Sequence, residues 1–510
     1  MKFLNKIQNA IQNNKIIQLI LLFLLSTILF KDYLSMHYAT DTYNVINAGY
    51  LEYAIHNSFV DGRIFAGALE VIANYINMPI NVLVISFTFV ALFISCIAVI
   101  VLRDMVLEIK ETESKKIRLL ITVISYITIF NFMYVENMYF IENLVMSISV
   151  LMYILSIREL VRKNKFYYLK AVVYAVIATF AYQGTICVFL LYGFVFSLIT
   201  SKENFKKFTK NLALIFSIAL ISFALNVIQI KIISAIAGID QQRLGGIGDM
   251  LLQLKEVIIC FKRMVLKDVI INTSGLFLKG LLIYFITAIM IASMIYEAKY
   301  PKENIVLFLV QIIVVAIIIS IAMCSINLLG YDTGRIHNEI GALLGMMLIF
   351  IYCSSDMFTK NVTISRILSI IFLIYFSLNC INTINILNQH KEVNKREKEF
   401  CQGLEEYIEQ YEKENNTKVV EAKFYKNYDG DKVYFDGISN KSVITYNGVY
   451  CTWSSIGTIN FYTNRKFERQ MIEYDGKNKE IIEKHMELKD QGYDNNFLII
   501  DGILYYNVFV

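Results

Sequence analysis

The polar segment from Asp32 to Arg63 contains the residues of this chain that are best suited to chemistry. It carries HYATD at positions 37–41 and DGR at positions 61–63, and strongly apolar stretches flank it at 16–30 and 80–101. Charged groups are costly inside a bilayer, so a segment like this between two spans is expected at or outside the membrane face. A carboxylate there can accept a proton from an attacking hydroxyl, and an arginine can bind a phosphate.

Four residues are the candidates for these two roles. Asp41 is the best candidate for the base, and Asp32, at the membrane boundary, could orient it. Arg63 follows a glycine that lets the backbone approach a ligand, and Arg335 is the basic residue of a later loop, so both are candidates to bind a phosphate. Ordinary interpretations stand beside these: a solvated loop carboxylate for Asp41, and arginines that extend to the membrane interface.

Other polar residues lie at the ends of later apolar stretches, where they could line a pocket for a sugar or an acceptor. These residues are Glu136, Glu142, Tyr182, Gln183 and His337. Glu142 stands within an apolar stretch, where an unpaired carboxylate is costly, so a partner on another helix is as good an explanation as substrate contact. We expect His37 and Asp61 to have structural roles.

The composition indicates a helical membrane protein with many spans. The chain has 510 residues, of which 56% are hydrophobic and 18% are charged, whereas soluble chains contain about 25% charged residues. Apolar runs predict about eleven spans. The expected spans are 16–31, 80–101, 118–134, 141–157, 170–182, 184–200, 211–229, 276–296, 304–326, 340–354 and 363–382.

The loops between these spans alternate in charge. Lysine and arginine are concentrated before the first span and in every second loop after it, whereas positions 134–140 and 182–184 contain neither. The positive-inside rule therefore predicts a cytoplasmic N-terminus and a C-terminal region outside the cytoplasm. It also places the candidate loops at the outer face of the cell membrane. The net charge of +5 is explained by anchoring lysines and does not indicate a nucleic-acid partner.

The sequence predicts two domains, a transmembrane domain at 1–389 and a small α+β domain at 390–510. The second domain begins with a charged stretch at 391–414 that has apolar residues at helical spacing. Runs typical of strands follow, several of them separated by Asp-Gly or Asn-Gly turn signals. The expected strands are 419–425, 442–446, 458–462, 497–500 and 503–510.

The order of these features resembles that of the Gtr type II glucosyltransferases, bacterial serotype-converting enzymes of the GT-C membrane glycosyltransferase superfamily. The resemblance covers about residues 16–385 and rests on an aspartate in the first outer loop, a Gly-Arg about twenty residues later, a Tyr-Gln at a mid-chain turn and an arginine in a late loop. It implies transfer of glucose or a related hexose from undecaprenyl phosphate to a surface polysaccharide. It also implies that Asp41 is the base and that Arg63 lies in the donor site.

The expected reaction is a single displacement with inversion, in which Asp41 deprotonates the acceptor and the arginines neutralise the leaving polyprenyl phosphate. No cofactor is predicted with certainty, although the resemblance is compatible with a divalent cation, Mg²⁺ or Mn²⁺. Three other functions stay open: a flippase or transporter of lipid-linked sugars, a non-catalytic scaffold for surface assembly, and a ligase that moves whole oligosaccharides. A transporter would be expected to show internal repeats and polar groups near mid-membrane, and the sequence shows no repeat.

Overall fold

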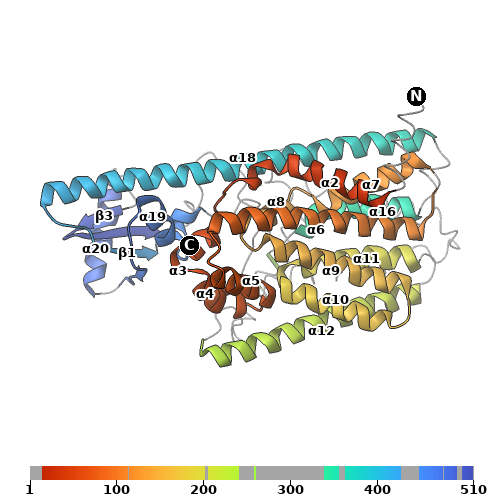
Figure 1. Cartoon of the computed structure of the whole chain (residues 1–510), viewed down its shortest axis with the longest axis horizontal. Coiled ribbons are helices and arrows are strands. Elements are labelled where there is room, and N and C mark those ends of the chain that lie inside the picture. Colours follow the sequence, from red (N-terminus) through yellow and green to blue (C-terminus); the bar gives the residue numbers. More distant parts are fainter. Residues whose placement is uncertain are drawn as a thin grey trace.

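The structure is a computed structural model that describes residues 14–112, 114–201, 205–239, 338–354, 362–426, 447–474, 476–490 and 497–508, together with the isolated positions 255, 258 and 259. Figure 1 shows an elongated molecule with a helical bundle at one end and a small domain with a sheet at the other. The expected spans 276–296 and 304–326 lie outside the described residues, as do Arg335 and His337.

Long helices that run along the molecule form the bundle (Figure 1). They are α2 (Lys15–Leu29), α6 (Ile80–Ile109), α7 (Lys115–Ile129), α9 (Asn143–Arg162), α10 (Tyr167–Ala181), α11 (Ile186–Ser201), α12 (Phe205–Ala237), α16 (Asn338–Ser354) and α18 (Val362–Asn415). Helices cover most of every expected span that falls within the described residues. The number of spans and the GT-C fold stay predictions.

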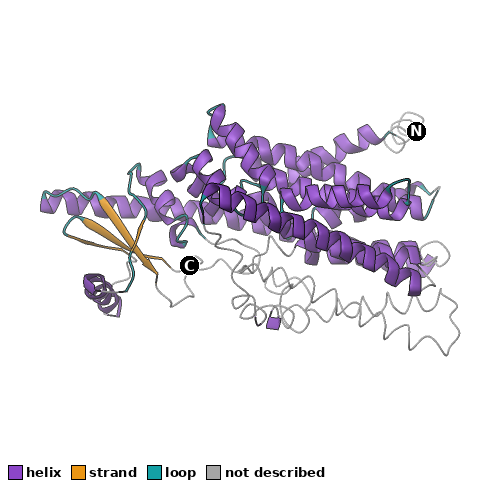
Figure 2. Cartoon of the chain, turned by 90° about the horizontal axis from the view of Figure 1, so that it is seen from below, coloured by secondary structure: helices purple, strands orange, loops and turns teal. Residues whose placement is uncertain are grey.

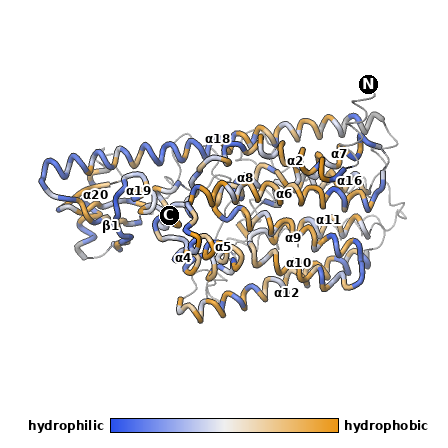
Figure 3. The backbone as a smooth tube through the Cα atoms, in the orientation of Figure 1, coloured by the Kyte–Doolittle hydropathy of each residue, from blue (hydrophilic) through white to orange (hydrophobic). Residues whose placement is uncertain are grey.

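Four helices in the described part are long and apolar enough to cross a membrane: Ile80–Ile109, Asn143–Arg162, Gln183–Ser201 and Lys206–Ala237. Each has at least the length that the hydrocarbon core requires at 1.5 Å of rise per residue. Figure 3 shows that hydrophobic residues predominate along the bundle, whereas the part of α18 beside the small domain is hydrophilic. The structure thus supports a helical membrane protein.

Short helices between α2 and α6 connect the bundle to the small domain. They are η1 (Lys31–Leu34), α3 (Thr40–Ala48), α4 (Tyr50–Tyr53), η2 (Ala54–Phe59) and α5 (Ile64–Tyr75). Gly62, in the turn between η2 and α5, has φ +83°, and a Cβ there would lie 2.8 Å from side-chain atoms of Asn226 and Ile230 on α12. Both the backbone angle and the close approach require glycine at this turn. Two more short elements, α8 (Tyr134–Tyr139) and η3 (Gln183–Thr185), lie where bundle helices meet.

Helix α18 joins the two ends of the molecule. It continues for 54 residues without a break, through the domain boundary expected at 389–390. The helix expected at 391–414 is its second half, and Leu404 and Ile408 on this half are fully buried in the core of the small domain. The two parts of the chain therefore share one rigid element.

The small domain is an α+β unit around a four-stranded sheet (Figure 2). Its elements are β1 (Glu421–Lys426), η6 (Gly448–Tyr450), α19 (Ser455–Thr463), β2 (Gln470–Met471), α20 (Gly476–Asp490), β3 (Phe497–Ile500) and β4 (Ile503–Val508). The strand order is β2-β1-β4-β3, with β1 parallel to β2 and β4, and β3 antiparallel to β4. Asp501 and Gly502 both have positive φ at the β3–β4 turn, as a tight hairpin requires.

The expected strands are confirmed at 421–426, 497–500 and 503–508, and the run 442–446 lies outside the described residues. The expected strand at 458–462 is wrong, because these residues belong to helix α19. Ile456 and Ile459 are both buried and lie three residues apart, so they share one face of a helix. Packing against the domain core and α3 decides the conformation of this short, ambiguous run.

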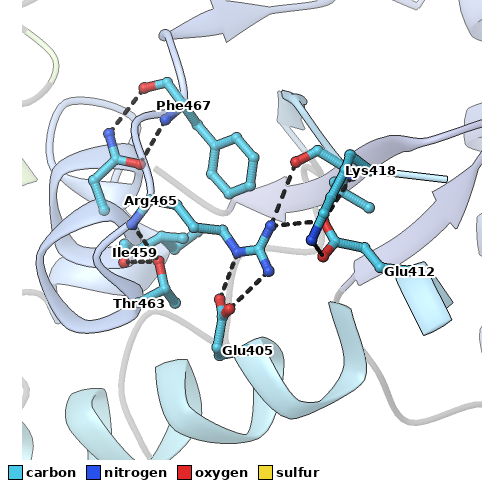
Figure 4. A network of polar contacts seen from close by, with 9 residues as sticks. Glu405, Glu412, Lys418, Ile459, Thr463, Arg465 and Phe467 are labelled. Atoms are coloured by element: carbon cyan, nitrogen blue, oxygen red, sulfur yellow. Dashed lines mark hydrogen bonds and ion pairs between the residues drawn. The ribbon is translucent and has the colours of Figure 1, made fainter. Parts of the chain in front are cut away.

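Arg465, directly after α19, ties the end of α18 to the rest of the small domain (Figure 4). Its Nε and Nη2 donate to the carboxylate of Glu405 at 2.6 and 2.7 Å, and its Nη1 donates to Glu412 at 3.0 Å. Lys418 also donates to Glu412, at 2.9 Å. Burial alone would raise the pKa of Glu412, but the hydrogen bonds from Arg465 and Lys418 lower it to about 2.

Candidate functional site

A buried arginine and a buried glutamate form the centre of the candidate site. Arg63 stands at the start of α5 and Glu142 at the start of α9, and both are at least 95% buried. Nη1 of Arg63 donates to both carboxylate oxygens of Glu142 at 2.8 Å, and the guanidinium lies 5.1 Å above the ring centre of Tyr182. Nη2 lies 3.7 Å from the carboxylate of Asp61. Within the described part of the chain, the buried Nε has no hydrogen-bond partner.

The turn that presents Arg63 is fixed from two neighbouring elements. Nε2 of Gln183, in η3, donates to the Asp61 carbonyl oxygen at 2.6 Å. Nδ2 of Asn226, on α12, donates to the Gly62 carbonyl oxygen at 2.8 Å. Among the described residues, the buried Oε1 of Gln183 has no partner. The turn is therefore held by two neighbouring elements, and two buried polar atoms beside it, Arg63 Nε and Gln183 Oε1, have no hydrogen-bond partner among the described residues.

Glu70, which lies on α5, adds a second buried carboxylate. Ser58 donates to its Oε1 at 2.8 Å, and its Oε2 has no partner among the residues described. Burial, and next the negative charge of Glu142, raise the pKa of Glu70 to about 8. Glu70 therefore carries a proton at neutral pH.

Tyr53 and Asp41 complete this group. Burial raises the pKa of Tyr53, and the charges of Asp41, Glu142 and Glu70 raise it further. The five side chains of Asp41, Tyr53, Arg63, Glu70 and Glu142, hereafter the acid–arginine cluster, therefore share one electrostatic environment. They come from α3, α4, α5 and α9, at the end of the bundle that faces the small domain (Figure 1).

Asp41 is the most accessible carboxylate of the cluster. It lies in the first turn of α3, where the helix dipole stabilises a negative charge, and it is only partly buried. Thr40 makes a long hydrogen bond to it, at 3.5 Å. After burial and the charge of Glu397, the charge of Asp41 also raises the pKa of the Cys451 thiol in the small domain. Asp41 thus lies between the buried part of the cluster and the small domain.

Glu136 and Asp32 belong to a second group. Glu136 lies 3.2 Å from Nε2 of His390 on α18, and the Nδ1 atom of His390 makes a short hydrogen bond with the Tyr33 hydroxyl. Asp32 is on η1 beside Tyr33, whose pKa its charge raises after burial and the charges of Glu136 and Tyr139. The ring of Tyr139 stacks on His390 with centres 3.9 Å apart. This second group fixes α18 to α8 and η1.

His37 packs in this second group, against the rings of Tyr33 and Tyr139. Burial lowers its pKa to about 4, so it is neutral at physiological pH. Its Nδ1 lies 3.0 Å from the Ser35 carbonyl oxygen. This environment agrees with the structural role expected from the sequence.

The structure therefore brings together five of the residues chosen from the sequence: Asp41, Arg63, Glu142, Tyr182 and Gln183. Asp32 lies in the second group, beside Tyr33. Tyr53 and Glu70 were missed by the sequence reasoning. A signal for Glu70 was present, because it is the single acidic residue in the apolar helix IFAGALEVIANY. No group of three or more His, Cys, Asp or Glu side chains in the described residues is placed to hold a metal ion.

Comparison with known proteins adds no relative: no family model, curated protein or solved structure matches the chain. A function must therefore be argued from the chemistry of the acid–arginine cluster.

Proposed function

We propose that this protein is a membrane glycosyltransferase that moves glucose or a related hexose from a polyprenyl-phosphate carrier to a cell-surface polysaccharide. The observation that carries the proposal is the acid–arginine cluster at one end of an apolar helical bundle. A lipid-linked donor needs its phosphate bound where its tail can stay in the bilayer. Such a reaction also needs a carboxylate near that phosphate that can accept a proton.

Asp41 is the proposed base. The acceptor hydroxyl oxygen forms a bond to the anomeric carbon while the bond from that carbon to the phosphate oxygen breaks, and Asp41 takes the hydroxyl proton. Glu70 is unsuited to this step at neutral pH because it already holds a proton, and Glu142 is occupied by Arg63. This leaves Asp41, which is partly exposed in the first turn of α3, as the carboxylate of the cluster closest to solvent and so to an acceptor.

Arg63 is the proposed ligand of the leaving phosphate. Its Nη1 is held by Glu142, which fixes the plane of the guanidinium, and its Nε has a hydrogen to donate. A phosphate oxygen is a strong acceptor for such a group and would satisfy this buried atom. In the proposed topology, this end of the bundle and the small domain face the outside of the cytoplasmic membrane. Arg335 would supply a second positive charge there.

The first test replaces the base. In purified protein supplied with a polyprenyl-phosphate-linked hexose and a polysaccharide acceptor, Asp41→Asn should reduce transfer at least about 100-fold, the lower end for loss of a general base. Glu52→Gln is a matched control, because Glu52 is on the neighbouring α4 with a side chain that is 60% exposed. It should transfer at the wild-type rate. Unchanged turnover in Asp41→Asn would remove the catalytic role of Asp41.

The same preparation separates transferase from transporter. In sealed vesicles, a transporter moves the intact lipid-linked sugar across the bilayer, whereas a transferase releases free polyprenyl phosphate. Mass analysis of the lipid fraction distinguishes these products. Release of polyprenyl phosphate that depends on the acceptor supports transfer, whereas movement of intact donor without cleavage would favour the transporter.

A further inference from the structure

Helix α3, which carries the proposed base, is in backbone contact with the small domain. A Cβ at Gly457 of α19 would lie 2.5 Å from the carbonyl oxygen of Tyr43, and a Cβ at Gly448 would lie 2.7 Å from the Tyr43 ring. Nδ2 of Asn460 donates to Oδ1 of Asn47 at 2.9 Å. There is no room for a side chain at Gly457 or at Gly448, where the backbone of the small domain packs directly on Tyr43, so the position of α3 depends on the small domain.

Glu397 on α18 connects three elements at this contact. It is 1% exposed. The Tyr43 hydroxyl of α3 donates to its Oε2 at 2.7 Å, and the Gly448 backbone N–H of η6 donates to its Oε1 at 2.5 Å. Asn394, on the same helix, donates to Oε2 at 2.9 Å. A buried carboxylate without such donors is strongly destabilising, so these bonds hold α3, α18 and η6 together.

Asn394 also forms hydrogen bonds to the segment that precedes α3. Its Oδ1 accepts from the Tyr38 backbone N–H at 2.9 Å, and its Nδ2 donates to the Tyr38 carbonyl oxygen at 2.7 Å. Asn394 and Glu397 lie three residues apart, on one face of α18. They therefore fix the chain at Tyr38 and at Tyr43, on both sides of Asp41.

We propose that Glu397 is a positioning residue that couples the small domain to α3 and so sets where Asp41 meets the acceptor hydroxyl. The role of Asp41 in this inference rests on the proposed function, whereas the coupling of the small domain to α3 does not. Arg63 is on α5, with no bond to Glu397 among its contacts. Loss of Glu397 should therefore misplace the base and leave binding of the donor phosphate unchanged.

The kinetic test uses two variants and one control. Because a displacement of about 1 Å costs about 100-fold in rate, Glu397→Ala should lower kcat by about that factor and leave KM for the lipid-linked donor within about two-fold. Glu397→Gln keeps one acceptor oxygen and should recover part of the loss. Glu399→Gln is the control, since that side chain is on the same helix and 58% exposed. Full activity in Glu397→Ala, or a change confined to KM, would overturn the positioning role.

Hydrogen exchange measures the coupling without any sugar transfer. In the full chain, backbone amides of residues 38–48 should exchange faster in Glu397→Ala than in wild type or Glu399→Gln, because the bonds to Tyr43 and Gly448 are lost. Unchanged exchange would refute the coupling. If Glu397→Ala does not fold, Tyr43→Phe removes the hydrogen bonds of this hydroxyl to Glu397 and to Tyr462 of the small domain, and it tests the same coupling. If wild type transfers no sugar, the proposed function fails and the exchange result still decides the coupling.

Discussion

Two arginines in this chain bind glutamates in opposite ways. Arg465 in the small domain uses all three guanidinium nitrogens, against Glu405 and Glu412 (Figure 4). Arg63 in the acid–arginine cluster bonds to Glu142 through Nη1, and its Nε is buried without a partner in the described part of the chain. The side chain of Arg63 is also the more buried, 6% exposed against 17% for Arg465.

The difference distinguishes a structural arginine from one that we propose binds a ligand. All three guanidinium nitrogens of Arg465 donate hydrogen bonds, so its bonds stabilise the end of α18 against the segment after α19. A buried N–H without an acceptor destabilises a protein by about 1–3 kcal/mol, unless a ligand supplies the acceptor. Arg63 keeps such a donor beside the carboxylates of Glu142 and Asp61 and the ring of Tyr182. We therefore expect substitutions around Arg63 to change both stability and sugar transfer, and those around Arg465 to change stability alone.

The largest expected effect comes from removal of the counter-charge. Glu142→Gln removes the nearer ionic partner of a buried guanidinium and leaves Asp61, 3.7 Å from Nη2, which should destabilise the protein by about 3 kcal/mol. Glu405→Gln removes one partner of a more exposed arginine that keeps Glu412, so the loss should be about 1 kcal/mol or less. Unfolding of both variants in detergent, followed by heat or denaturant, measures the contrast. Equal losses would mean that Arg63 and Arg465 are bound in equivalent environments.

The next effect is on transfer. Arg63→Lys keeps a positive charge beside Glu142 but removes the Nε donor and the planar geometry of the guanidinium. We expect sugar transfer to fall about 100-fold, as for loss of one preorganised donor in an active site. Arg465→Lys is the matched change in the small domain and should leave transfer near the wild-type rate. A fully active Arg63→Lys protein would show that the unpartnered Nε has no part in the reaction.

Much of this arrangement could be predicted from the sequence. Long apolar runs indicated the helices of the bundle, because only internal backbone hydrogen bonds satisfy a chain in a membrane. The Asp-Gly turn signal between two strand-like runs indicated the β3 and β4 strands and the turn that joins them. Gly62 was expected to let the backbone approach a ligand, whereas the group that lies close to it in the structure is α12. These features depend on a few neighbouring residues, which one sequence displays.

The composition of the clusters could not be predicted in the same way. Glu136 and Glu142 are six residues apart, yet one binds His390 and the other binds Arg63, because the short helix α8 ends between them. Glu397 is one acid among many on a charged helix, and only the docking of α3 and η6 buries it. Such choices depend on packing between segments hundreds of residues apart. The spacing of residues along the sequence does not indicate that packing.

The smallest expected effect is on how the stability of the protein depends on pH. Glu70 has a pKa raised to about 8 by burial and the charge of Glu142, whereas bonds from Arg465 and Lys418 lower the pKa of Glu412 to about 2. The stability that protonated Glu70 contributes is fully present below its unfolded pKa of about 4.3, and is lost as the pH rises through about 8. The stability that ionised Glu412 contributes is present above about 4.3 and is lost as the pH falls toward 2.

Substitution of Glu70 and of Glu412 by glutamine should therefore change the pH dependence of stability in opposite directions. Relative to wild type, Glu70→Gln should become more stable as the pH rises from about 5 to 9, since its amide cannot ionise. Glu412→Gln should be less stable than wild type at neutral pH, and this difference in stability should disappear as the pH falls below about 4. Unfolding temperatures of the three proteins across this range measure both trends. A Glu70→Gln difference that stays constant with pH would mean that Glu70 is ionised in the folded protein, and Glu70 would then compete with Asp41 as the base.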